Sequence, residues 1–341
     1  METHRPTLIS VVLPSYNECE GLPIVIASIF TVLGQTGFSH EIIVVDDGST
    51  DETRPAMLAL CAAHPNLRYL RLSRNFGKEA ALSAGLRAAA GHAVILMDAD
   101  GQHPPSLIPK LLESWRAGFE VVAAVQADRL ESWLKRLFKH SYYHLMEAGS
   151  SVVIPPDAGD FRLLDRKVVD AINMLPERNR LMKGLYAWVG FRTDYIPFQA
   201  EKRIAGTTKF TWGHLFRLAF TGLTSFTVVP LRLVSVVGLI ISVTSLLYGA
   251  YLLFERLVVE DHLPGWATLA VGMMFLSGVQ LLALGVIGEY LGRTFEEAKQ
   301  RPIYIIAEDS RVKAVPHAVA PVYDATPMVQ EARLPETPAV P

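Results

Sequence analysis

The sequence predicts an α/β fold with a doubly wound, mostly parallel sheet, followed by amphipathic juxtamembrane helices and a hairpin of two transmembrane helices. Three observations support this prediction. The chain has 341 residues, which is enough for about two domains of ~150 residues each. Residues 1–200 alternate short apolar runs with helical patterns, as in a parallel sheet covered by helices. Hydrophobic residues make up 50% of the chain and charged residues only 19%, and two long stretches near the C-terminus contain no charged side chain.

The composition also excludes some classes of protein. A hydrophobic content of 50% is too high for a chain that is disordered throughout. The formal net charge of −2 gives no overall basic field, so we expect no nucleic-acid partner.

Four short apolar runs predict the first strands of the sheet. They are Leu8–Leu13, Glu41–Val45, Leu67–Leu72 and Ala93–Met97. Helical patterns lie between them, over Glu18–Leu33 and over the Ala-rich segment Lys78–Ala90, which Gly91 ends. This alternation of strands and helices is typical of a doubly wound sheet.

Polar residues follow three of these four strands. They lie at residues 16–18, 46–47 and 98–100. Ligands of doubly wound sheets bind beyond the carboxyl ends of the strands, so we expect one crevice to collect all three clusters.

The third cluster suggests a metal site. Asp98 and Asp100 can direct their carboxylates at one cation, and Gln102 is close enough in sequence to add an amide oxygen. Such oxygen ligands favour Mg²⁺ or Mn²⁺ over Zn²⁺. A solvated acidic turn would show the same residues. No glycine-rich phosphate loop of the GxxxxGK[ST] or GxGxxG type follows the first strand, so metal and basic side chains would hold any phosphate.

Two uncharged stretches predict membrane spans. Leu233–Phe254 and Leu263–Gly288 are each long enough, at ~1.5 Å per helical residue, to cross a hydrocarbon core of ~30 Å. We place the spans at about residues 230–254 and 264–288. Basic residues lie before the first span and after the second, while the connector Glu255–His262 has one arginine, so both flanks and both termini are expected in the cytoplasm.

These observations divide the chain into four parts. We expect a cytoplasmic α/β domain at 1–200, juxtamembrane amphipathic helices at 201–227, the two spans within 228–293, and a cytoplasmic tail at 294–341 that is mostly disordered after 307. We expect no signal peptide, because the first apolar run is too short.

Several motifs carry a resemblance to a known family. In order, they are SVVLPSYNE at 10–18, VVDDGSTD at 44–51, RNFGK at 74–78, MDADGQHPP at 97–105, AGDFRLLD at 158–165, RIAGTTKF at 203–210 and GEYLGR at 288–293. With the hairpin, the chain resembles family 2, GT-A fold glycosyltransferases that act on polyprenyl phosphates, such as bactoprenol glucosyltransferases and dolichol-phosphate mannose synthases. The resemblance covers roughly residues 6–306.

The resemblance implies transfer of a hexose from a nucleotide sugar to a polyprenyl phosphate such as undecaprenyl phosphate, at the cytoplasmic face of the inner or plasma membrane. UDP-glucose is the favoured donor, because residues 181–224 most resemble the bactoprenol enzymes. GDP-mannose, UDP-N-acetylhexosamine and UDP-aminoarabinose remain open. The acceptor phosphate is already a nucleophile, so one displacement is expected, and it inverts the anomeric centre. The resemblance also implies a homo-tetramer.

The resemblance assigns roles to particular residues. The donor pocket is expected to involve Pro14, Tyr16, Asn17, Glu18, Asp46, Asp47, Lys78 and Asp98. The metal, Mg²⁺ or Mn²⁺, is expected at Asp98, Asp100 and Gln102. The catalytic set is Asp160, Asp100 and Arg203, with Asp160 as the base or as the group that positions the acceptor. The acceptor phosphate is expected at Arg203, Lys209 and Arg129.

Other interpretations remain for these residues. Lys78 could begin a solvated helix, Asp160 could pair with Arg162 in a loop, and Arg203 and Lys209 could touch lipid headgroups. The whole chain could instead be a processive polysaccharide synthase, although Gln126–Leu130 matches the QxxRW element of such enzymes poorly. It could also be a non-catalytic membrane scaffold.

Overall fold

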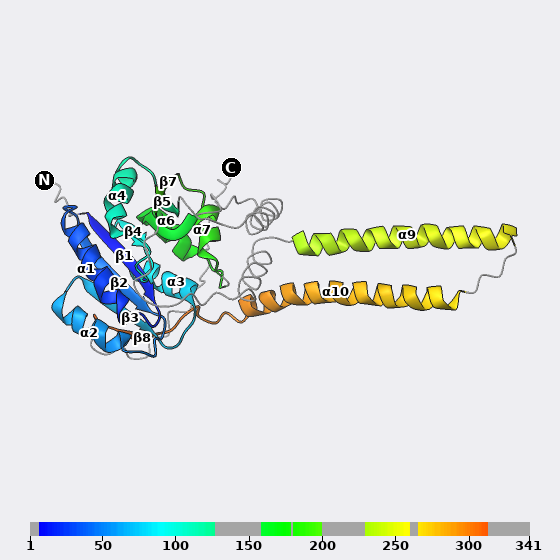
Figure 1. Ribbon diagram of the computed structural model, residues 1–341, viewed down its shortest axis with the longest axis horizontal. Helices are drawn as coiled ribbons and strands as arrows, with labels where there is room; N and C mark the ends of the chain where they lie inside the picture. Colours follow the sequence, from blue (N-terminus) through cyan, green and yellow to red (C-terminus); the bar gives the residue numbers. More distant parts are fainter. Residues whose placement is uncertain (1–6, 127–157, 179, 200–228, 260–264, 313–341) are drawn as a thin grey trace, which may run out of the picture.

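The computed structural model describes residues 7–126, 158–178, 180–199, 229–259 and 265–312. These residues form a mixed sheet with helices on both faces and a long helical hairpin that extends from one end of it (Figure 1). The sheet and hairpin confirm the predicted fold class.

Eight strands form one sheet in the order β7-β5-β6-β4-β1-β2-β3-β8. The strands are β1 (Leu8–Ser15), β2 (Ser39–Asp46), β3 (Leu67–Leu72), β4 (Ala93–Leu96), β5 (Val121–Gln126), β6 (Ala158–Asp165), β7 (Thr193–Phe198) and β8 (Ile306–Asp309). The first four strands are parallel to one another, as predicted. Strand β6 runs antiparallel to β4 and β5, and β8 runs antiparallel to β3.

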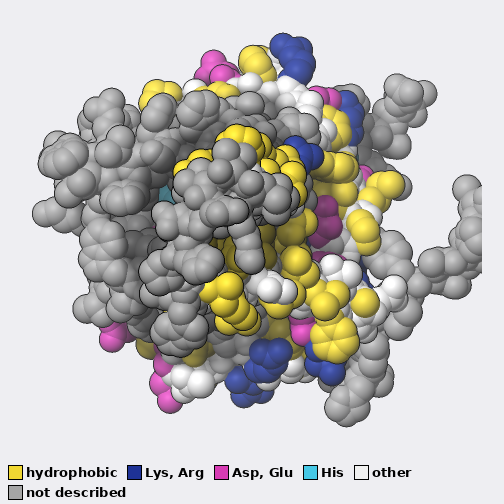
Figure 2. All heavy atoms as spheres, turned by 90° about the vertical axis from the view of Figure 1, so that its right-hand side faces the viewer, with side chains coloured by type: hydrophobic (Ala, Val, Ile, Leu, Met, Phe, Trp, Pro, Cys, Tyr) yellow, Lys and Arg dark blue, Asp and Glu magenta, His cyan; other side chains and the backbone are white. Residues whose placement is uncertain are grey.

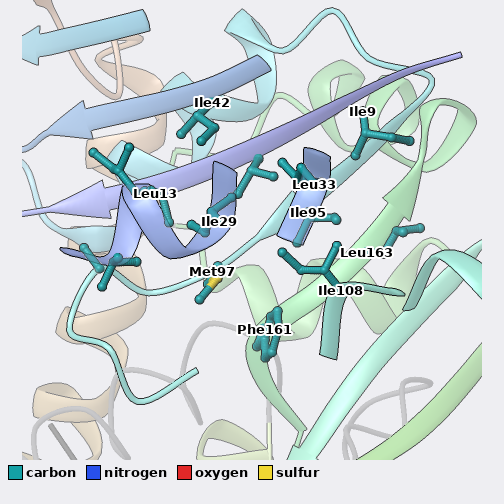
Figure 3. Packing of buried hydrophobic residues seen from close by; sticks show 14 of the residues in the cluster. Ile9, Leu13, Ile29, Leu33, Ile42, Ile95, Met97, Ile108, Phe161 and Leu163 are labelled. Atoms are coloured by element: carbon teal, nitrogen blue, oxygen red, sulfur yellow. The ribbon is translucent and has the colours of Figure 1, made fainter. Parts of the chain in front are cut away.

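Helices cover both faces of the sheet, as expected for a doubly wound fold. The helices of the α/β part are α1 (Gly21–Gly34), α2 (Thr53–Ala63), α3 (Lys78–Ala88), the 3₁₀ helix η1 (Pro105–Leu107), α4 (Ile108–Arg116), α6 (Arg166–Met174) and α7 (Met182–Trp188). One buried apolar cluster packs α1, α2 and α4 on one face (Figure 3), and a second packs α3, α6 and α7 on the other.

The central strand β1 shows how the sequence produces these two layers. Ile9, Leu13 and their neighbours of the same parity enter the first cluster, and Val12 enters the second, because successive side chains of a strand point to opposite faces. Helix α3 lies close to β1 at Gly85, where an added Cβ would be 2.2 Å from Val12 Cγ1. Glycine therefore permits the close packing that brings the start of α3 to the carboxyl edge of the sheet.

The hairpin consists of α9 (Val229–Val259) and α10 (Trp266–Ala298), which lie side by side (Figure 1). Leu231–Tyr251 and Val271–Ala298 are long and apolar enough to cross a membrane, with mean hydropathies of 2.1 and 1.9, and neither is buried against protein. Figure 2 looks along the hairpin and shows hydrophobic side chains gathered in the middle of the view. An apolar surface of this kind is stable only against lipid or another protein.

Helix α10 extends beyond the span expected to end at residue 288. Its last turns are polar and contain an ion pair of Arg293 with Glu289 at 2.9 Å. Glu297 then accepts a hydrogen bond of 2.9 Å from the backbone N–H of Arg178, whose Nε donates to the carbonyl of Arg301 at 2.8 Å. The end of the hairpin is therefore held directly on the α/β part.

The chain after the hairpin returns to the sheet as β8. Arg68 donates to both carboxylate oxygens of Asp309, at 3.1 and 2.7 Å, and Arg54 does the same to Glu308, at 2.7 and 3.0 Å. The boundary expected at 307 thus falls inside a strand, because Arg68 of β3 and Arg54 of α2 hold this segment. The rest of that expected tail, 313–341, and the expected juxtamembrane helices at 201–227 lie outside the described residues.

Candidate functional site

The loops after β1 and β2 are joined by side-chain hydrogen bonds at the carboxyl edge of the sheet. Asn17 has a positive φ of 56°. Its backbone N–H donates to Ser49 Oγ at 2.9 Å, and its Oδ1 accepts from the Thr50 N–H at 2.9 Å. An asparagine tolerates this backbone conformation better than most residues, so it suits the position. These bonds join the first polar cluster to the loop that follows the second, and the two loops form one continuous rim.

Asp46 lies beneath this rim and is fully buried. One carboxylate oxygen accepts from the hydroxyl of Tyr69 at 2.6 Å, and the other accepts from the N–H and hydroxyl of Ser49. Arg71 Nε lies 3.6 Å from the carboxylate. Asp46 thus shapes the rim from below, and its expected contact with the donor remains a prediction.

Asp47 connects the rim to the loop before α3. Its carboxylate accepts from the N–H groups of Phe76 at 2.7 Å and Gly77 at 2.9 Å. Burial raises the pKa of Asp47, although these two N–H groups oppose the increase. At Gly48, with φ of 70°, an added Cβ would lie 2.5 Å from the backbone of Arg74. The glycine therefore allows the loops after β2 and β3 to touch.

Lys78, the first residue of α3, joins the remaining two polar clusters. Its Nζ lies 2.6 Å from Asp98 Oδ1 and 2.6 Å from Asp160 Oδ2. Asp98 follows β4, and Asp160 lies on β6. The lysine begins α3 and is partly exposed, yet it also joins two carboxylates, and Asp160 is paired with Lys78 rather than with Arg162.

The electrostatics of this bridge favour the charged forms of Asp160 and Lys78. Burial raises the pKa of Asp160, but the charge of Lys78 outweighs it, and the pKa falls to about 2. Burial lowers the pKa of Lys78, while the carboxylates of Asp160 and Asp98 raise it above its ordinary value. The other oxygen of Asp160 is buried and accepts no hydrogen bond from the described residues. A buried polar atom without a partner is costly, so this oxygen marks a point of interest in the site.

The predicted metal ligands lie in the loop after β4. Asp100 Oδ1 accepts from the Gln102 N–H at 3.1 Å across Gly101, which has a positive φ of 76°. In the described part of the chain, no three His, Cys, Asp or Glu side chains are grouped to hold an ion. The loop itself offers two carboxylates and an amide, from Asp98, Asp100 and Gln102. This small set fits Mg²⁺ or Mn²⁺, because these ions take further ligands from water and substrate phosphates.

His103 and Phe161 support this loop from below. His103 Nδ1 accepts from the Asp98 N–H at 2.9 Å, and its ring stacks on Phe161 with centroids 4.9 Å apart. Burial lowers the pKa of His103. The ring of His103 therefore fixes the backbone at Asp98, and it packs on the residue that follows Asp160.

Two groups near Asp160 were given no functional role by sequence reasoning. Glu79 accepts from the Met182 N–H at 3.1 Å, and burial, together with the charge of Asp160, raises its pKa to about 7. Arg162 is buried, with its guanidinium 3.8 Å from the centre of the Tyr186 ring. Their only sequence signal is position: Glu79 follows the lysine of RNFGK, and Arg162 follows GDF.

The other predicted site residues have different environments. Pro14 is buried in β1, Tyr16 is 39% exposed at the rim, and the Glu18 N–H donates to Thr53 Oγ1 at 3.3 Å. The expected acceptor-phosphate residues lie outside the described residues: Arg129, Arg203 and Lys209. Of the predicted site residues, the structure brings together those of the rim, those of the loop after β4 and Asp160.

Comparison with family models gives two matches. Residues 10–172 match the model described as glycosyl transferase family 2. Residues 229–294 match the model described as the GtrB C-terminal hairpin. The two matches correspond to the α/β part and to the two apolar helices, so the hairpin is shared with relatives and associates with a membrane.

Curated relatives match along most of the chain. An uncharacterized glycosyltransferase of Synechocystis is 44% identical over 88% of this chain and 95% of its own. A bactoprenol glucosyl transferase of Shigella phage SfII is 42% identical over 89% of this chain and 98% of its own. A prophage bactoprenol glucosyl transferase homolog of Escherichia coli is 41% identical over 87% and 98%.

Among solved structures, one match is glucosyl-3-phosphoglycerate synthase from Mycobacterium tuberculosis in complex with Mn²⁺ and UDP-glucose. It is 20% identical, covers 64% of this chain and 77% of its own, and has a TM-score of 0.43. Because this likeness is low, family membership follows from the sequence relatives.

Proposed function

The chain belongs to glycosyl transferase family 2, and from this premise we propose that it transfers a hexose from a nucleotide sugar to a polyprenyl phosphate at the cytoplasmic membrane face. It is a glycosyltransferase with a membrane-associated hairpin. Glucose from UDP-glucose is the first candidate, since relatives at 41–42% identity are named bactoprenol glucosyl transferases.

The Lys78 bridge is the observation that carries this proposal. The ammonium contacts Asp98 and Asp160 at 2.6 Å each, so the expected metal loop and the expected acceptor-positioning carboxylate face one another. A reaction between two phosphate-bearing substrates needs this proximity of groups more than it needs a strong base. Lys78 can balance negative charge on either substrate once its carboxylate partners bind other ligands.

The donor diphosphate would lie against the loop after β4. Asp98, Asp100 and Gln102 would hold a divalent cation there, and such an ion neutralises charge on the leaving nucleotide. Asn17 and Glu18, at the joined rim, would bind the nucleoside with Pro14, Tyr16, Asp46 and Asp47. Their role in donor binding is supported by their position at the carboxyl edge of the sheet.

Transfer with inversion is the proposed course of the reaction. A phosphate oxygen of the acceptor attacks the anomeric carbon, and the nucleoside diphosphate leaves in the same displacement. Asp160 would position the acceptor through its buried oxygen that has no partner among the described residues. An α-linked donor then gives a β-linked lipid phosphate, and NMR of the product would contradict this if the linkage were α.

We place the active domain and both ends of the chain in the cytoplasm and expect a homo-tetramer. The basic residues after α10 support the orientation. Gly238 and Gly249, on α9, support helix–helix contact. Cross-linking in mild detergent tests the tetramer, and a product limited to monomers contradicts it.

A donor panel tests the proposed substrate. Membranes containing the full chain are incubated with undecaprenyl phosphate, Mg²⁺ or Mn²⁺, and UDP-glucose, GDP-mannose, UDP-N-acetylglucosamine or UDP-aminoarabinose. Mass spectrometry of the lipids should show a hexosyl phosphate lipid with UDP-glucose. A product from another donor only would contradict the choice of glucose, and a lack of product from every donor would contradict transfer itself.

A further inference from the structure

A cleft of about 1100 Å³ lies between the start of α3 and the carboxyl-terminal end of α10. One wall is the segment 73–80, and the other is α10 from Gly288 to Glu297. Arg178, Arg180 and the segment 301–305 complete the lining. Figure 1 shows the end of α10 beside α3. The cleft adjoins both the proposed site and the hairpin.

The α10 wall is open along two glycines. Gly288 and Gly292 are four residues apart and therefore lie on one face of the helix. A Cβ added at either position would meet no atom within 4 Å. The space beside the helix is therefore available to a ligand.

Basic residues outnumber acidic residues around the cleft. The basic residues are Arg74, Lys78, Arg178, Arg180, Arg293 and Arg301, and the acidic residues are Glu79, Glu289, Glu296 and Glu297. Two of the acids pair with arginines of the cleft, at Arg293–Glu289 and Arg178–Glu297. The guanidinium of Arg74 lies 4.0 Å over the ring of Phe76 and donates to the Asn75 carbonyl. Neither of these contacts is with a carboxylate, so neither neutralises its charge. Lys78 is paired with Asp98 and Asp160, which are not part of this lining, so the arginines supply the positive charge that suits an anionic ligand.

The cleft connects the membrane to the proposed catalytic carboxylates. Lys78 is part of its lining and contacts both Asp98 and Asp160. At the opposite wall, the lining of α10 begins at Gly288, where the long uncharged stretch ends. A ligand with a phosphate and an apolar chain could therefore lie along α10 and present its phosphate toward Lys78.

We propose that this cleft binds the acceptor lipid, with the phosphate among the arginines and the first part of the chain along Gly288 and Gly292. This inference rests on the proposed function, and it concerns residues other than Arg129, Arg203 and Lys209. A phosphate monoester carries more charge than the diester of a bulk phospholipid, so the basic cleft favours the acceptor.

The glycine wall allows a sharp test. In Gly292→Leu the added Cβ meets no atom within 4 Å, and leucine is a better helix former than glycine, so the chain should fold as well as the wild type. Gly272→Leu is the matched control, since it lies in α10 away from the cleft and its added Cβ also meets nothing within 4 Å. Steady-state transfer should show a KM for undecaprenyl phosphate raised about tenfold or more in Gly292→Leu only, with the KM for the nucleotide sugar unchanged.

A charge variant and a binding assay complete the test. Arg301→Glu reverses an exposed charge of the cleft. Native mass spectrometry of the full chain, without nucleotide sugar, measures retention of undecaprenyl phosphate. Wild type and Gly272→Leu should retain this lipid, and Gly292→Leu and Arg301→Glu should retain about a tenth or less. Equal retention by all four proteins would overturn the proposal.

Competition distinguishes the possible sources of the phosphate group. Phosphatidylglycerol and inorganic phosphate, each at the concentration of the lipid acceptor, should not displace undecaprenyl phosphate. Displacement by phosphatidylglycerol would show a site for structural lipid. Displacement by inorganic phosphate would show that the lipid chain makes no contact with Gly288 and Gly292. Either result overturns the proposal.

The failure of this inference can be separated from a failure of the proposed function. If wild type makes the lipid product and Gly292→Leu makes it with unchanged KM values, only the cleft proposal falls. If wild type transfers no sugar to undecaprenyl phosphate and the lipid does not bind, both fall. Binding that Gly292→Leu abolishes supports the cleft even if transfer is absent.

Discussion

Removing the ammonium at residue 78 is the most informative perturbation of the proposed site. In Lys78→Met, Asp98 and Asp160 lose the cation that lies 2.6 Å from each of them. The side chain of Asp160 is only 12% exposed, so water replaces that partner poorly. We therefore expect a less stable protein and a less acidic Asp160.

The pKa of Asp160 gives the magnitude. It falls from an ordinary 3.8 to about 2, and each tenfold change in proton affinity corresponds to about 1.4 kcal/mol, so the charged form is favoured by about 2 kcal/mol. Lys78 is 43% exposed, and solvent screening reduces the share that it supplies. We expect Lys78→Met to lower the free energy of unfolding by about 1–2 kcal/mol, or Tm by roughly 2–8 °C for a domain of this size.

A double-mutant cycle measures this interaction. Tm and denaturant midpoints are compared for wild type, Lys78→Met, Asp160→Asn and the double variant, in the full chain in detergent. The coupling should be about 1 kcal/mol or more above pH 4 and should fade as the pH drops toward 2, because a carboxyl whose folded pKa is depressed contributes stability only while it is ionised. Lys110→Met, at an exposed position of α4, is the control. Additive effects at neutral pH would refute the reasoning.

Three further predictions concern other parts of the molecule. Asp100→Ala should lower metal-dependent transfer by about 100-fold without changing Tm, and transfer that persists with the same Mn²⁺ dependence would argue against the metal site. Burial and the charge of Asp160 raise the pKa of Glu79 to about 7 from 4.5. The folded state therefore holds a proton that the unfolded chain releases, and the free energy of unfolding should fall between about pH 4.5 and 7. In a series of Tm values against pH, Glu79→Gln should flatten this fall. Asp309→Ala should lower the free energy of unfolding by about 2 kcal/mol, and Glu308→Ala should lower it by less than about 1 kcal/mol. The reason is that the side chain of Asp309 is 9% exposed and that of Glu308 is 28% exposed. Equal losses in denaturant titrations would contradict the buried anchoring of β8.

The first half of the fold could be predicted because its signals are local. Apolar runs, helical periodicity and polar strand ends predicted the four parallel strands and their crossovers. Strand β6 could not be placed in this way, since it inserts between β4 and β5 and pairs with residues far away in sequence. Strand β8 depends on partners that are still more distant in sequence, because Asp309 follows the hairpin and binds Arg68, which precedes it by 241 residues.

The site shows the same division. The carboxyl edge of the sheet collects the clusters at Asn17, Asp46 and Asp98, as parallel topology requires. The bridge from Lys78 to Asp160 depends on the packing of α3 and β6 on the same sheet, which no local pattern contains. The motif resemblance named both residues, but only the fold shows that they touch.

The most direct test of the central claim compares two acceptors that differ only in the phosphate. Purified full chain, UDP-glucose and Mn²⁺ are incubated with undecaprenyl phosphate or with undecaprenol, and the lipids are analysed by mass spectrometry. We predict glucosyl phosphoundecaprenol from the phosphate and no product from the alcohol, with the signal lost in Asp160→Asn. Glucosylation of the alcohol, or an undiminished product from Asp160→Asn, would contradict the account.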